Sequence, residues 1–523
     1  MPVPASVLQA GSKVLVVGGG IGGLSYAYFL SRLRPDIKVK LLETRQNCRG
    51  SIVSKPTSLP DGSVVNLEKG PRTLRGVSDS AVIIMDLVRQ LGESQSIYGI
   101  AKDSPANRKF LLDHKGELLQ LPNSWKTFRK FMQNPLSDGL VRGILGEPFR
   151  RTRPESSADE SAFDLFVRRF GNAQVPNNLL SSLFHGIYGD DIQLLSAQRI
   201  ARRFYEMEQE HSSFIRAGIS GIFKKPALSL SLDKYQETFG RDKEELLQLK
   251  KTLSQFPILG FKGGMEFLPR LILKELSGMP NVEICTGKLV SAVSPAKDGK
   301  IEVVAKDGTR YTGIDHVRLA VSPMSIKRML SEQSISSHLE RASANTIAVV
   351  NFYLPKKDVI ADYHSFGYLA PISIPNPHKL LGVIFDSVVE RSYTPLFAPS
   401  TDRFAQGQYT KMTAMMGGHY FSQQDLQNPP SEDGIIQNIK NVFKRHLHIS
   451  EADLAAAHWS VTLAKNCIPH FHVGYNQWET VLRGKIQSEY GHRISLGGMA
   501  FSSGPGVPDV FMNGFLDAVS MAK

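Results

Sequence analysis

The sequence predicts a mixed α/β fold, and three observations carry this prediction. An apolar strand-like run, a glycine-rich turn and a helical pattern follow one another over residues 13–32. A second apolar run at residues 39–42 then ends on an acidic residue. Short alternating apolar runs return at residues 282–321 and again at residues 345–385, which is typical of a broad sheet.

The glycine-rich turn has the spacing of a dinucleotide-binding loop. Gly18, Gly20 and Gly23 fit the pattern G-x-G-x-x-G, and Glu43 ends the second apolar run. The first glycine permits the turn, the second lets backbone N–H groups approach a pyrophosphate, and the third lets helix and strand pack closely. A carboxylate such as Glu43 can bind the ribose hydroxyls. The alternative is a glycine-rich turn with no ligand, but the complete pattern favours a nucleotide site.

The number of such motifs bears on the cofactor. The chain has one strand-linked G-x-G-x-x-G, whereas a flavin reductase that uses NAD(P)H as a separate donor would need a second. One bound FAD, reduced by the substrate and reoxidised by a small acceptor such as oxygen, accounts for the single site. We find no metal-ligand spacing and no G-x-S-x-G nucleophile turn, so neither a metal nor a catalytic dyad is expected.

The end of the chain offers a second contact with the cofactor. A strand-like run leads to Gly498, a Gly/Pro turn follows, and a helix is expected from about Asp509, with Pro508 before it and Asp509 as its N-cap. The N-terminus of this helix could face the nucleotide. The alternative is an ordinary terminal helix with a tight entry turn.

Composition limits the class of protein. The chain has 523 residues, 41% of them hydrophobic, and a formal net charge of +13, which suits a globular protein with an anionic ligand or surface. It shows no zinc-finger spacing and no RNA-binding signature, so nucleic acid is not expected as a partner. The three cysteines form no C-x-x-C, so a disulfide framework is not expected. The sequence also shows neither an apolar run long enough to span a bilayer nor a cleavable leader.

Several distant segments together resemble the oxygen-dependent protoporphyrinogen oxidases of the mitochondrial type, within the flavin monoamine oxidase superfamily. The resemblance covers nearly the whole chain. It is carried by Gly70-Pro71-Arg72 with Arg75, Asn107-Arg108, Gly186-Ile-Tyr188-Gly189-Asp190, Phe366-Gly367-Tyr-Leu369 with Leu381–Ser387, and Lys465–Pro469 before Gly474.

Two segments depart from the pattern. The superfamily usually has Arg-x-Gly-Gly near the end of the cofactor loop, whereas Arg49-Gly50-Ser51 stands here. The family's Tyr-Ala-Gly-Asp is varied to Tyr188-Gly189-Asp190. The first departure bears on the backbone contact with the flavin, and the second on how this segment borders the pocket.

The resemblance implies a fold in three parts: a Rossmann-like FAD-binding domain of the amine-oxidase and glutathione-reductase type, a mixed-sheet substrate domain and an inserted helical membrane-binding domain. Their expected bounds are 1–88, 256–330 and 481–523 for the FAD-binding domain, 89–210 for the helical domain, and 211–255 with 331–480 for the substrate domain.

The resemblance also implies the reaction. Protoporphyrinogen IX would be oxidised to protoporphyrin IX in the penultimate step of heme biosynthesis, with three O₂ consumed and three H₂O₂ released. Each round would pass a hydride from a meso carbon to a non-covalently bound FAD, and no strong side-chain base is needed. The implied location is the mitochondrial inner membrane, peripheral or monotopic on the intermembrane-space side. The implied partners are the anionic membrane surface, a ferrochelatase and a second copy of the chain.

The expected cofactor-binding residues combine the glycine loop, its neighbours and the C-terminal turn. They are Gly18, Gly20, Ile21, Gly22, Gly23, Glu43, Thr44, Arg49, Gly50, Ser51, Gly70, Pro71, Arg72, Val290, Gly498, Val507, Pro508 and Asp509. For Arg72 a structural role is weighed beside the cofactor, and Val290 would offer backbone hydrogen bonds to the adenine.

The expected substrate-binding residues are Arg108, Gly186, Phe366, Gly367 and Leu369. Arg108 would pair with a propionate, because an Arg–carboxylate pair is directional and strong. The apolar residues would enclose the flat macrocycle, and glycine would leave room for it. The alternatives are a surface arginine for Arg108 and plain core positions for Phe366 and Leu369.

Residues 124–170 interleave aromatic residues with cations, which suits attachment to an anionic membrane. Trp125, Phe128 and Phe131 share one expected helical face, and Phe166 and Phe170 follow beside Arg168 and Arg169. The alternative is an amphipathic helix packed on the core.

Two other functions use the same fold. An amine or polyamine oxidase would share the FAD site but would not explain the Asn107-Arg108, Gly186–Asp190 and Lys465–Pro469 segments together. A non-enzymatic relative of the GDP-dissociation-inhibitor kind would keep the fold without flavin chemistry.

Overall fold

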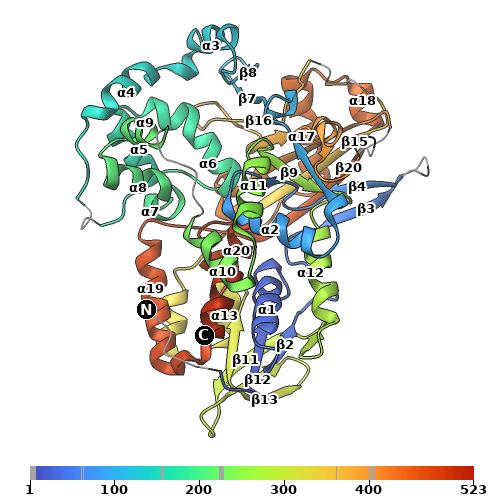
Figure 1. The fold of residues 1–523 in the computed structure, drawn as a ribbon. Coiled ribbons are helices and arrows are strands. Elements are labelled where there is room, and N and C mark those ends of the chain that lie inside the picture. The colour runs from blue at the N-terminus through green and yellow to red at the C-terminus, as the bar shows by residue number, and fades with distance from the viewer. Residues whose placement is uncertain are drawn as a thin grey trace.

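The computed structural model describes residues 8–59, 62, 64–154, 158–222, 229–357, 359–360, 362–399, 401, 404 and 407–523. Figure 1 shows three regions: a nucleotide-binding half at the bottom, a sheet domain at the upper right and a lobe of helices at the upper left. Within the described part, none of the helices combines the length and the apolarity needed to span a bilayer.

A five-stranded parallel sheet organises the nucleotide-binding half, in the order β10-β2-β1-β14-β21. The central strand β1 is buried from Val14 to Val17, as expected where helices or further strands cover both faces of a parallel sheet. The strands of this sheet are β1 (Lys13–Val17), β2 (Lys38–Leu42), β10 (Val282–Cys285), β14 (His316–Leu319) and β21 (Ile494–Leu496). The half is therefore assembled from both ends and the middle of the chain.

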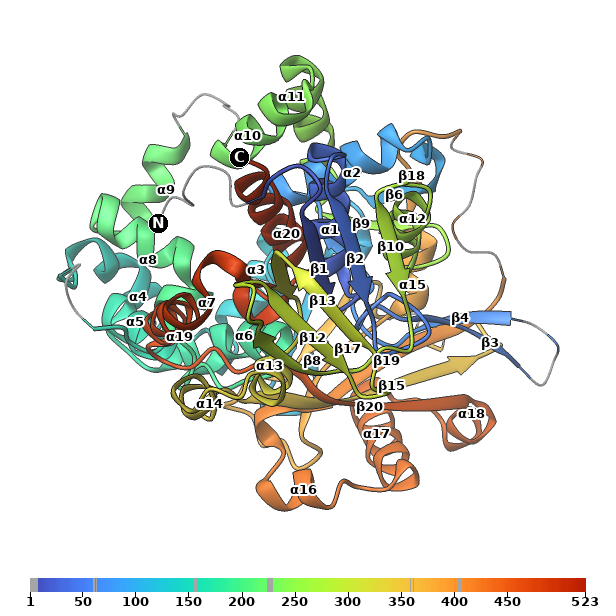
Figure 2. The same ribbon diagram turned by 90° about the horizontal axis from the view of Figure 1, so that it is seen from below.

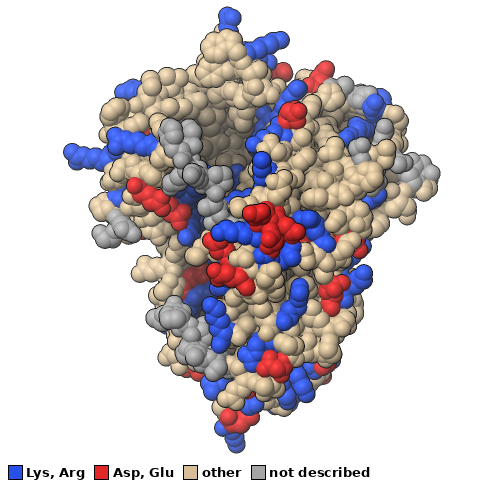
Figure 3. All heavy atoms as spheres, in the orientation of Figure 1, with Lys and Arg blue, Asp and Glu red and all other residues tan. Residues whose placement is uncertain are grey.

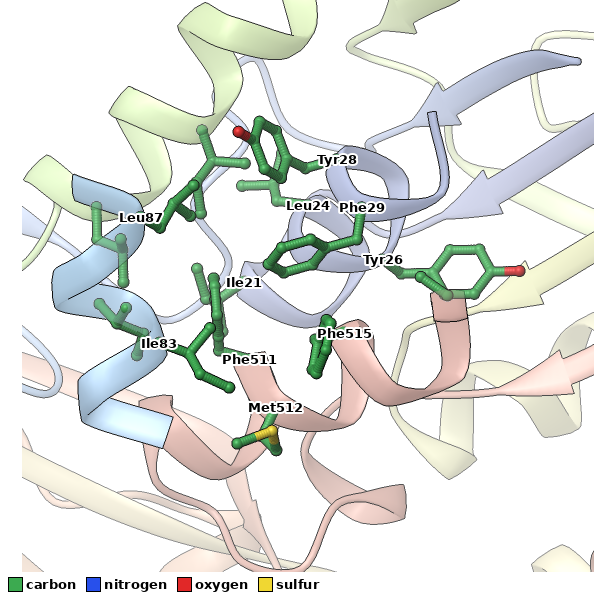
Figure 4. Packing of buried hydrophobic residues seen from close by; sticks show 14 of the residues in the cluster. Ile21, Leu24, Tyr26, Tyr28, Phe29, Ile83, Leu87, Phe511, Met512 and Phe515 are labelled. Atoms are coloured by element: carbon green, nitrogen blue, oxygen red, sulfur yellow. The ribbon is translucent and has the colours of Figure 1, made fainter. Parts of the chain in front are cut away.

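Three helices pack beside this sheet: α1 (Ile21–Leu33), α2 (Asp79–Gln90) and α20 (Val507–Ala522). Figure 4 shows the side chain of Phe29 facing those of α20, and its ring centroid lies 5.5 Å from that of Phe511 and 5.0 Å from that of Phe515. The helices α1 and α20 cross closely, because a Cβ added at Gly514 would lie 2.0 Å from Ser25 Oγ. The last helix is thus part of the nucleotide-binding core.

The remaining elements of this half surround the sheet. They are β3 (Ser54–Ser58) and β4 (Val64–Glu68), the three-stranded sheet β11 (Val290–Pro295), β12 (Ile301–Ala305) and β13 (Arg310–Ile314), and the helices α12 (Phe267–Ser277), α13 (Pro323–Met329), α14 (Gln333–Leu339) and α19 (Tyr475–Tyr490). In Figure 2, which looks from below, β11, β12 and β13 lie beside β1 and β2.

A seven-stranded sheet organises the second domain, in the order β20-β15-β19-β17-β16-β7-β8. Its strands are β7 (Lys109–Leu112), β8 (Leu118–Gln120), β15 (Ala344–Leu354), β16 (Gly367–Leu369), β17 (Leu380–Ile384), β19 (Thr410–Gly417) and β20 (His458–Pro469). The helices α15 (Asp386–Ser392), α16 (Gln423–Gln427), α17 (Glu432–Leu447) and α18 (Glu451–Ala456) belong to the same stretch of chain.

A four-stranded sheet, β18-β6-β9-β5, joins the two domains. Its strands are β5 (Leu74–Arg75), β6 (Ile97–Ile100), β9 (Ile258–Phe261) and β18 (Thr394–Pro395). The lobe contains α3 (Trp125–Met132), α4 (Leu140–Gly146), α5 (Ala162–Phe170), α6 (Ser181–Tyr188), α7 (Ala197–Ile200), α8 (Arg202–His211) and α9 (Phe214–Ile222).

The structure differs from the expected domain bounds in two places. Residues 89–210 are not only helical: β6 belongs to the joining sheet, and β7 and β8 form the edge of the second domain's sheet. These strands are only three or four residues long, and β7 pairs with β16, which comes far later in the chain. No local sequence pattern therefore predicts them.

The second difference concerns residues 211–255, which the resemblance assigns to the substrate domain. Apart from residues 223–228, which lie outside the described residues, they form α9, α10 (Leu230–Phe239) and α11 (Lys243–Leu253). Leu246, Leu249 and Leu253 of α11 belong to the core that contains α1 and α2. The apolar face of α11 is therefore buried against the nucleotide-binding half and not against the substrate domain.

Candidate functional site

The glycine loop between β1 and α1 has the close packing that its spacing predicts. Gly18 has φ +106°, where a side chain is strained. A Cβ added at Gly23 would lie 1.9 Å from the Gly18 carbonyl oxygen, so no larger residue fits without a shift of the backbone. Gly20 is the N-cap of α1 and offers no side-chain cap, which leaves first-turn N–H groups of a buried helix end without a capping partner.

Two helix ends meet at this loop. A Cβ added at Gly22 would lie 2.9 Å from a methyl carbon of Val510 and 3.1 Å from Gly498 Cα, so the start of α20 lies against the start of α1. The N-cap of α20 is Gly506, again without a side-chain cap. The predicted N-cap, Asp509, is therefore wrong: the helix begins earlier because Pro508 fits its first turn, and Asp509 lies within that turn.

These features fit a bound dinucleotide. Two uncapped helix N-termini and a loop free of side chains form a cradle for a pyrophosphate. Gly50 closes it from the other side, since its Cβ would lie 3.0 Å from Gly20 Cα. Ile21 and Val507, expected at the cofactor, are the first residues of the two helices.

Glu43 lies at the rim of the loop. One carboxylate oxygen accepts a hydrogen bond from the N–H of Gly19 at 2.7 Å, and the other accepts one from the N–H of Arg45 at 2.8 Å. Thr44 is exposed beside it. The N–H of Lys288 donates to the Glu43 carbonyl oxygen at 2.9 Å, which brings the start of β11, with Val290, toward the same rim. The acid and the predicted adenine contact are thus neighbours.

The segment Arg49-Gly50-Ser51 is held by an acid that sequence reasoning missed. Arg49 pairs with Glu266 at 2.9 Å, and Glu266 also accepts from the N–H of Ser54 at 2.9 Å. The Nε atom of Arg49 is buried without a hydrogen-bond partner among the described residues. A Cβ added at Gly70 would lie 2.2 Å from the Ser51 carbonyl oxygen, so the Gly70-Pro71 turn packs directly on this segment.

Arg72 connects the two domains. Its guanidinium pairs with Asp386 at 2.8 Å, and both side chains are 8% exposed. Thr413 Oγ1 donates to the same carboxylate at 2.6 Å. This pairing favours the structural role for Arg72, and its contact with the cofactor stays a prediction. Asp386 lies in a quoted motif, but only the fold reveals its partner.

Lys69, two residues before Pro71, makes a similar connection. Its ammonium donates to Asn351 Oδ1 at 2.9 Å on β15 and to Ser460 Oγ at 2.6 Å on β20. Burial lowers the pKa of Lys69 to about 8. Sequence reasoning missed this residue because its partners lie hundreds of positions away.

The expected substrate residues gather around the edge of the seven-stranded sheet. The Arg108 carbonyl oxygen accepts from the N–H of Phe366 at 3.0 Å, and β7 runs parallel to β16. A Cβ added at Gly186 would lie 2.8 Å from a methyl carbon of Leu369, so α6 covers this edge. Gly367 has φ +148°, and its Cβ would meet the Val383 carbonyl oxygen at 2.0 Å. The five residues are neighbours in space.

Their environments differ. The Arg108 side chain is exposed, whereas Phe366 is partly buried against the cluster that contains Tyr98 and Ile100. The contacts of Phe366 with this cluster also fit the alternative that it is a plain core residue. The binding roles of all five residues stay predictions.

His185 lies next to Gly186 and is 1% exposed. Burial, and then the charge of the neighbouring His419, lower its pKa to about 3. The two rings are 5.8 Å apart, and neither nitrogen of His185 has a well-formed hydrogen bond among the described residues. His185 is therefore a neutral histidine at neutral pH.

Glu68 predicts a pH dependence of stability. Burial raises its pKa to about 7, although Ser54 Oγ donates to it at 2.8 Å. Because the folded protein holds this proton more tightly than the unfolded chain, the contribution of Glu68 to stability falls as pH rises from about 4.5 to about 7 and is constant above that.

We expect Glu68→Gln to remove this contribution. The unfolding temperature of the variant minus that of wild type should therefore increase between about pH 5 and about pH 8, where Glu68 loses its proton in the folded wild type. Thermal unfolding at several pH values measures the difference. Parallel curves for the two proteins over this interval would contradict the assignment.

The stretch expected at a membrane is divided by the structure. Trp125 is 79% exposed and Phe128 is 40% exposed, whereas Phe131 is buried. Phe166 is also buried, and the Arg168 and Arg169 side chains are paired with acids inside the lobe. The prediction that these later residues face a membrane is wrong, because Phe166 packs in a core cluster and both arginines form ion pairs within the lobe.

Other apolar side chains of the lobe are exposed as well, and with Trp125 and Phe128 they make up the set called here the apolar surface on α3 and α4. They lie on α4 and just after it: Val141, Ile144, Leu145 and Phe149. In Figure 3 the surface is hollowed below α3, between the lobe and the sheet domain, and Lys and Arg side chains line part of the rim.

Comparisons with known proteins agree with this architecture. The NAD(P)-binding Rossmann-like domain family matches residues 16–91. A solved structure of putrescine oxidase shares the fold with a TM-score of 0.62 at 14% identity, over 97% of this chain and 98% of the other. A structure from Exiguobacterium sp. 255-15, provisionally named a protoporphyrinogen oxidase, matches with a TM-score of 0.68 at 18% identity, over 98% and 99%. The class is that of flavoenzymes with the amine oxidase fold, which points to a flavin cofactor.

The sequence comparison is more specific. Protoporphyrinogen oxidase of Saccharomyces cerevisiae is 44% identical over the full length of both chains. The chain belongs to the protoporphyrinogen oxidase family.

Proposed function

We propose that this protein oxidises protoporphyrinogen IX to protoporphyrin IX with O₂, in the penultimate step of heme biosynthesis. Three rounds remove six electrons, and three O₂ become three H₂O₂. Membership of the whole chain in the family carries the proposal. The cradle at Gly20 and the gathered residues around Leu369 support it, because they supply a cofactor site and a wall for a flat macrocycle.

We infer that the cofactor is non-covalent FAD. When bound, FAD supplies a two-electron acceptor that O₂ reoxidises. The uncapped starts of α1 and α20 would hold its pyrophosphate, and Glu43 would bind its ribose. Arg49, with a buried Nε lacking a partner among the described residues, offers a further donor.

The chain's own contribution to the reaction is position and exclusion of water. Leu369 and Gly186 form a close-packed wall at the sheet edge, and Arg108 stands at the start of the neighbouring strand. Such a wall would hold a meso carbon in a fixed place. His185 is neutral and enclosed, so it is not a strong base for the substrate.

The decisive experiment is anaerobic mixing of the flavin-loaded protein with protoporphyrinogen IX. We expect the visible flavin absorbance to bleach and to return when O₂ is admitted. Bleaching by polyamines but not by protoporphyrinogen would assign an amine oxidase instead. A colourless protein that cannot be reconstituted with FAD would favour the non-enzymatic relative.

Arg108→Ala should mainly raise KM for protoporphyrinogen, by the loss of about 1.5–3 kcal/mol for one hydrogen-bonded charge pair. Because the Arg108 side chain is exposed, its removal should leave the fold intact, so a higher KM would report weaker substrate binding. Steady-state kinetics at several substrate concentrations measure it. If KM and kcat both stay at wild-type values, Arg108 does not bind the propionate.

We further propose that the apolar surface on α3 and α4 attaches the protein peripherally to an anionic membrane, the mitochondrial inner membrane on its intermembrane-space side. Trp125 is exposed on α3, whose last turn carries Arg129 and Lys130, and Phe149 is exposed after α4, which suits insertion at the headgroup level. A ferrochelatase and a second copy of the chain are the proposed protein partners at this location.

Replacing Trp125, Leu145 and Phe149 together by Ser should reduce the affinity for anionic vesicles, measured by sedimentation, by at least about ten-fold, because about 0.8 kcal/mol is lost for each buried methylene equivalent. Leu426→Ser is the control, since this residue is similarly apolar and 42% exposed but lies on α16. Equal sedimentation of the triple variant and wild type would remove this surface from the proposal.

A further inference from the structure

Two consecutive cations, Arg108 and Lys109, stand at the start of β7. In a strand, neighbouring side chains point to opposite faces of the sheet. Lys109 pairs with Gly367 and Leu111 pairs with Leu369 in the parallel ladder β7-β16. Paired residues share a face, so Lys109 lies on the face that carries Leu369.

That face is the one that α6 covers. The contact between Gly186 and Leu369 fixes α6 against it. Lys109 lies opposite Gly367, two residues from the Leu111–Leu369 pair. Gly367 pairs in turn with Ile384, and Asp386 just after it binds Arg72, so this end of the ladder is the one nearer the nucleotide-binding half. The lysine therefore lies at the edge of the wall proposed to hold the macrocycle.

A second cation approaches from the joining sheet. Arg75 on β5 pairs with Ile258, which pairs in turn with Ile100 of β6. Ile258 and Phe366, the residue next to Gly367, pack against the same buried cluster, which contains Ile100. This row places Arg75 on the side of the joining sheet that faces the start of β16.

Electrostatics agree with this proximity. Partial burial, and then the charge of Arg75, lower the pKa of Lys109. Arg75 also acts on Asp509 in the first turn of α20, where burial raises the pKa and the charge of Arg75 opposes that rise. The charge of Arg75 thus acts both on the start of β7 and on the first turn of α20.

Neither cation has an acidic partner of its own. Across the described ranges, no ion pair and no side-chain hydrogen bond is formed by Arg75 or by Lys109, whereas Arg72, three residues before Arg75, pairs with Asp386. Both side chains are exposed, so a ligand can reach them, and two like charges close together favour the binding of an anion. A carboxylate of the ligand would supply that anion.

We propose that Lys109, supported by Arg75, is a second carboxylate anchor, which holds the propionate that Arg108 does not reach. This inference rests on the proposed function, because it takes the substrate to be a macrocycle with two carboxylates. The two anchors are consecutive residues where β7 begins, and by binding the two carboxylates of one macrocycle they would fix its in-plane rotation.

The test is equilibrium binding of protoporphyrin IX and of its dimethyl ester in detergent, followed by porphyrin fluorescence. The proteins are flavin-loaded wild type, Lys109→Met, Lys109→Arg and the control Lys102→Met, an exposed lysine seven residues upstream. We expect Lys109→Met to weaken binding of the free diacid about 10- to 100-fold, as for one charged hydrogen bond, and to leave the ester unchanged. Lys109→Arg should restore most of the binding.

Three results would overturn the inference. Unchanged binding of the diacid by Lys109→Met would remove Lys109 from the site. Equal weakening of the diacid and the ester would assign it a structural role. If wild type neither binds the diacid nor shows anaerobic bleaching, the proposed function itself is overturned. If wild type bleaches normally and Lys109→Met binds the diacid as wild type does, only the second anchor is overturned.

Discussion

Gly23→Ala protein is expected to purify without its yellow flavin. The added Cβ would lie 1.9 Å from the Gly18 carbonyl oxygen, so strand β1 and helix α1 must move apart. Overpacking of this kind costs about 1–3 kcal/mol or more. It also displaces the N–H groups at the start of α1 that would face the pyrophosphate. Visible absorbance per protein and the thermal midpoint measure both effects.

Gly484→Ala is the matched control for this variant. Gly484 is exposed within α19, and an added Cβ would meet nothing within 4 Å. Because glycine is unfavourable in a helix interior, we expect the control to keep its flavin and to gain about 0.5–1 kcal/mol. Full flavin content in the Gly23→Ala protein would contradict the assignment of this loop as the cofactor cradle.

Arg169→Met is expected to destabilise the helical lobe by about 3–5 kcal/mol, as for breaking a buried ion pair. Arg169 is fully buried and pairs with Glu147 and Glu208, which are also fully buried. Burial alone would raise the pKa of Glu147, but hydrogen bonds from Ser213 and Arg169 outweigh it and hold that pKa below its ordinary value. Without Arg169, two carboxylates would remain buried with too few cations.

Urea unfolding at constant slope, together with limited proteolysis of residues 125–222, measures this loss. Arg202→Met is the control, because Arg202 pairs with Glu206 at 2.7 Å on the surface, where such pairs contribute about 0.2–1 kcal/mol. Similar midpoints for the two variants would show that the buried network does not stabilise the lobe.

The local part of the fold could be predicted from the sequence. The strand β1, the helix α1 and the strand β2 agree with the expected elements, because apolar runs and glycine spacing are local signals. The pairing of β7 with β16 could not be predicted, since a four-residue strand has no distinctive period and its partner is more than 250 positions away.

The candidate site divides in the same way. Glycines and Glu43 follow from spacing, and the structure places them together around one loop. The interactions of Arg72 with Asp386 and of Arg49 with Glu266 depend on the packing of separate domains. No spacing rule connects such positions, so these acids could be found only from the three-dimensional arrangement.

The assembly of the nucleotide sheet has a consequence for biosynthesis. The strand β21 completes a sheet whose first strand is β1, and α20 packs on α1 only when the last residues of the chain exist. At about 5–20 residues per second, synthesis of such a chain takes on the order of a minute. During that time the glycine loop lacks the helix that covers it. The cradle is therefore incomplete until α20 has been synthesised, and a chain shortened by this helix would lack the helix start that lies against Gly22.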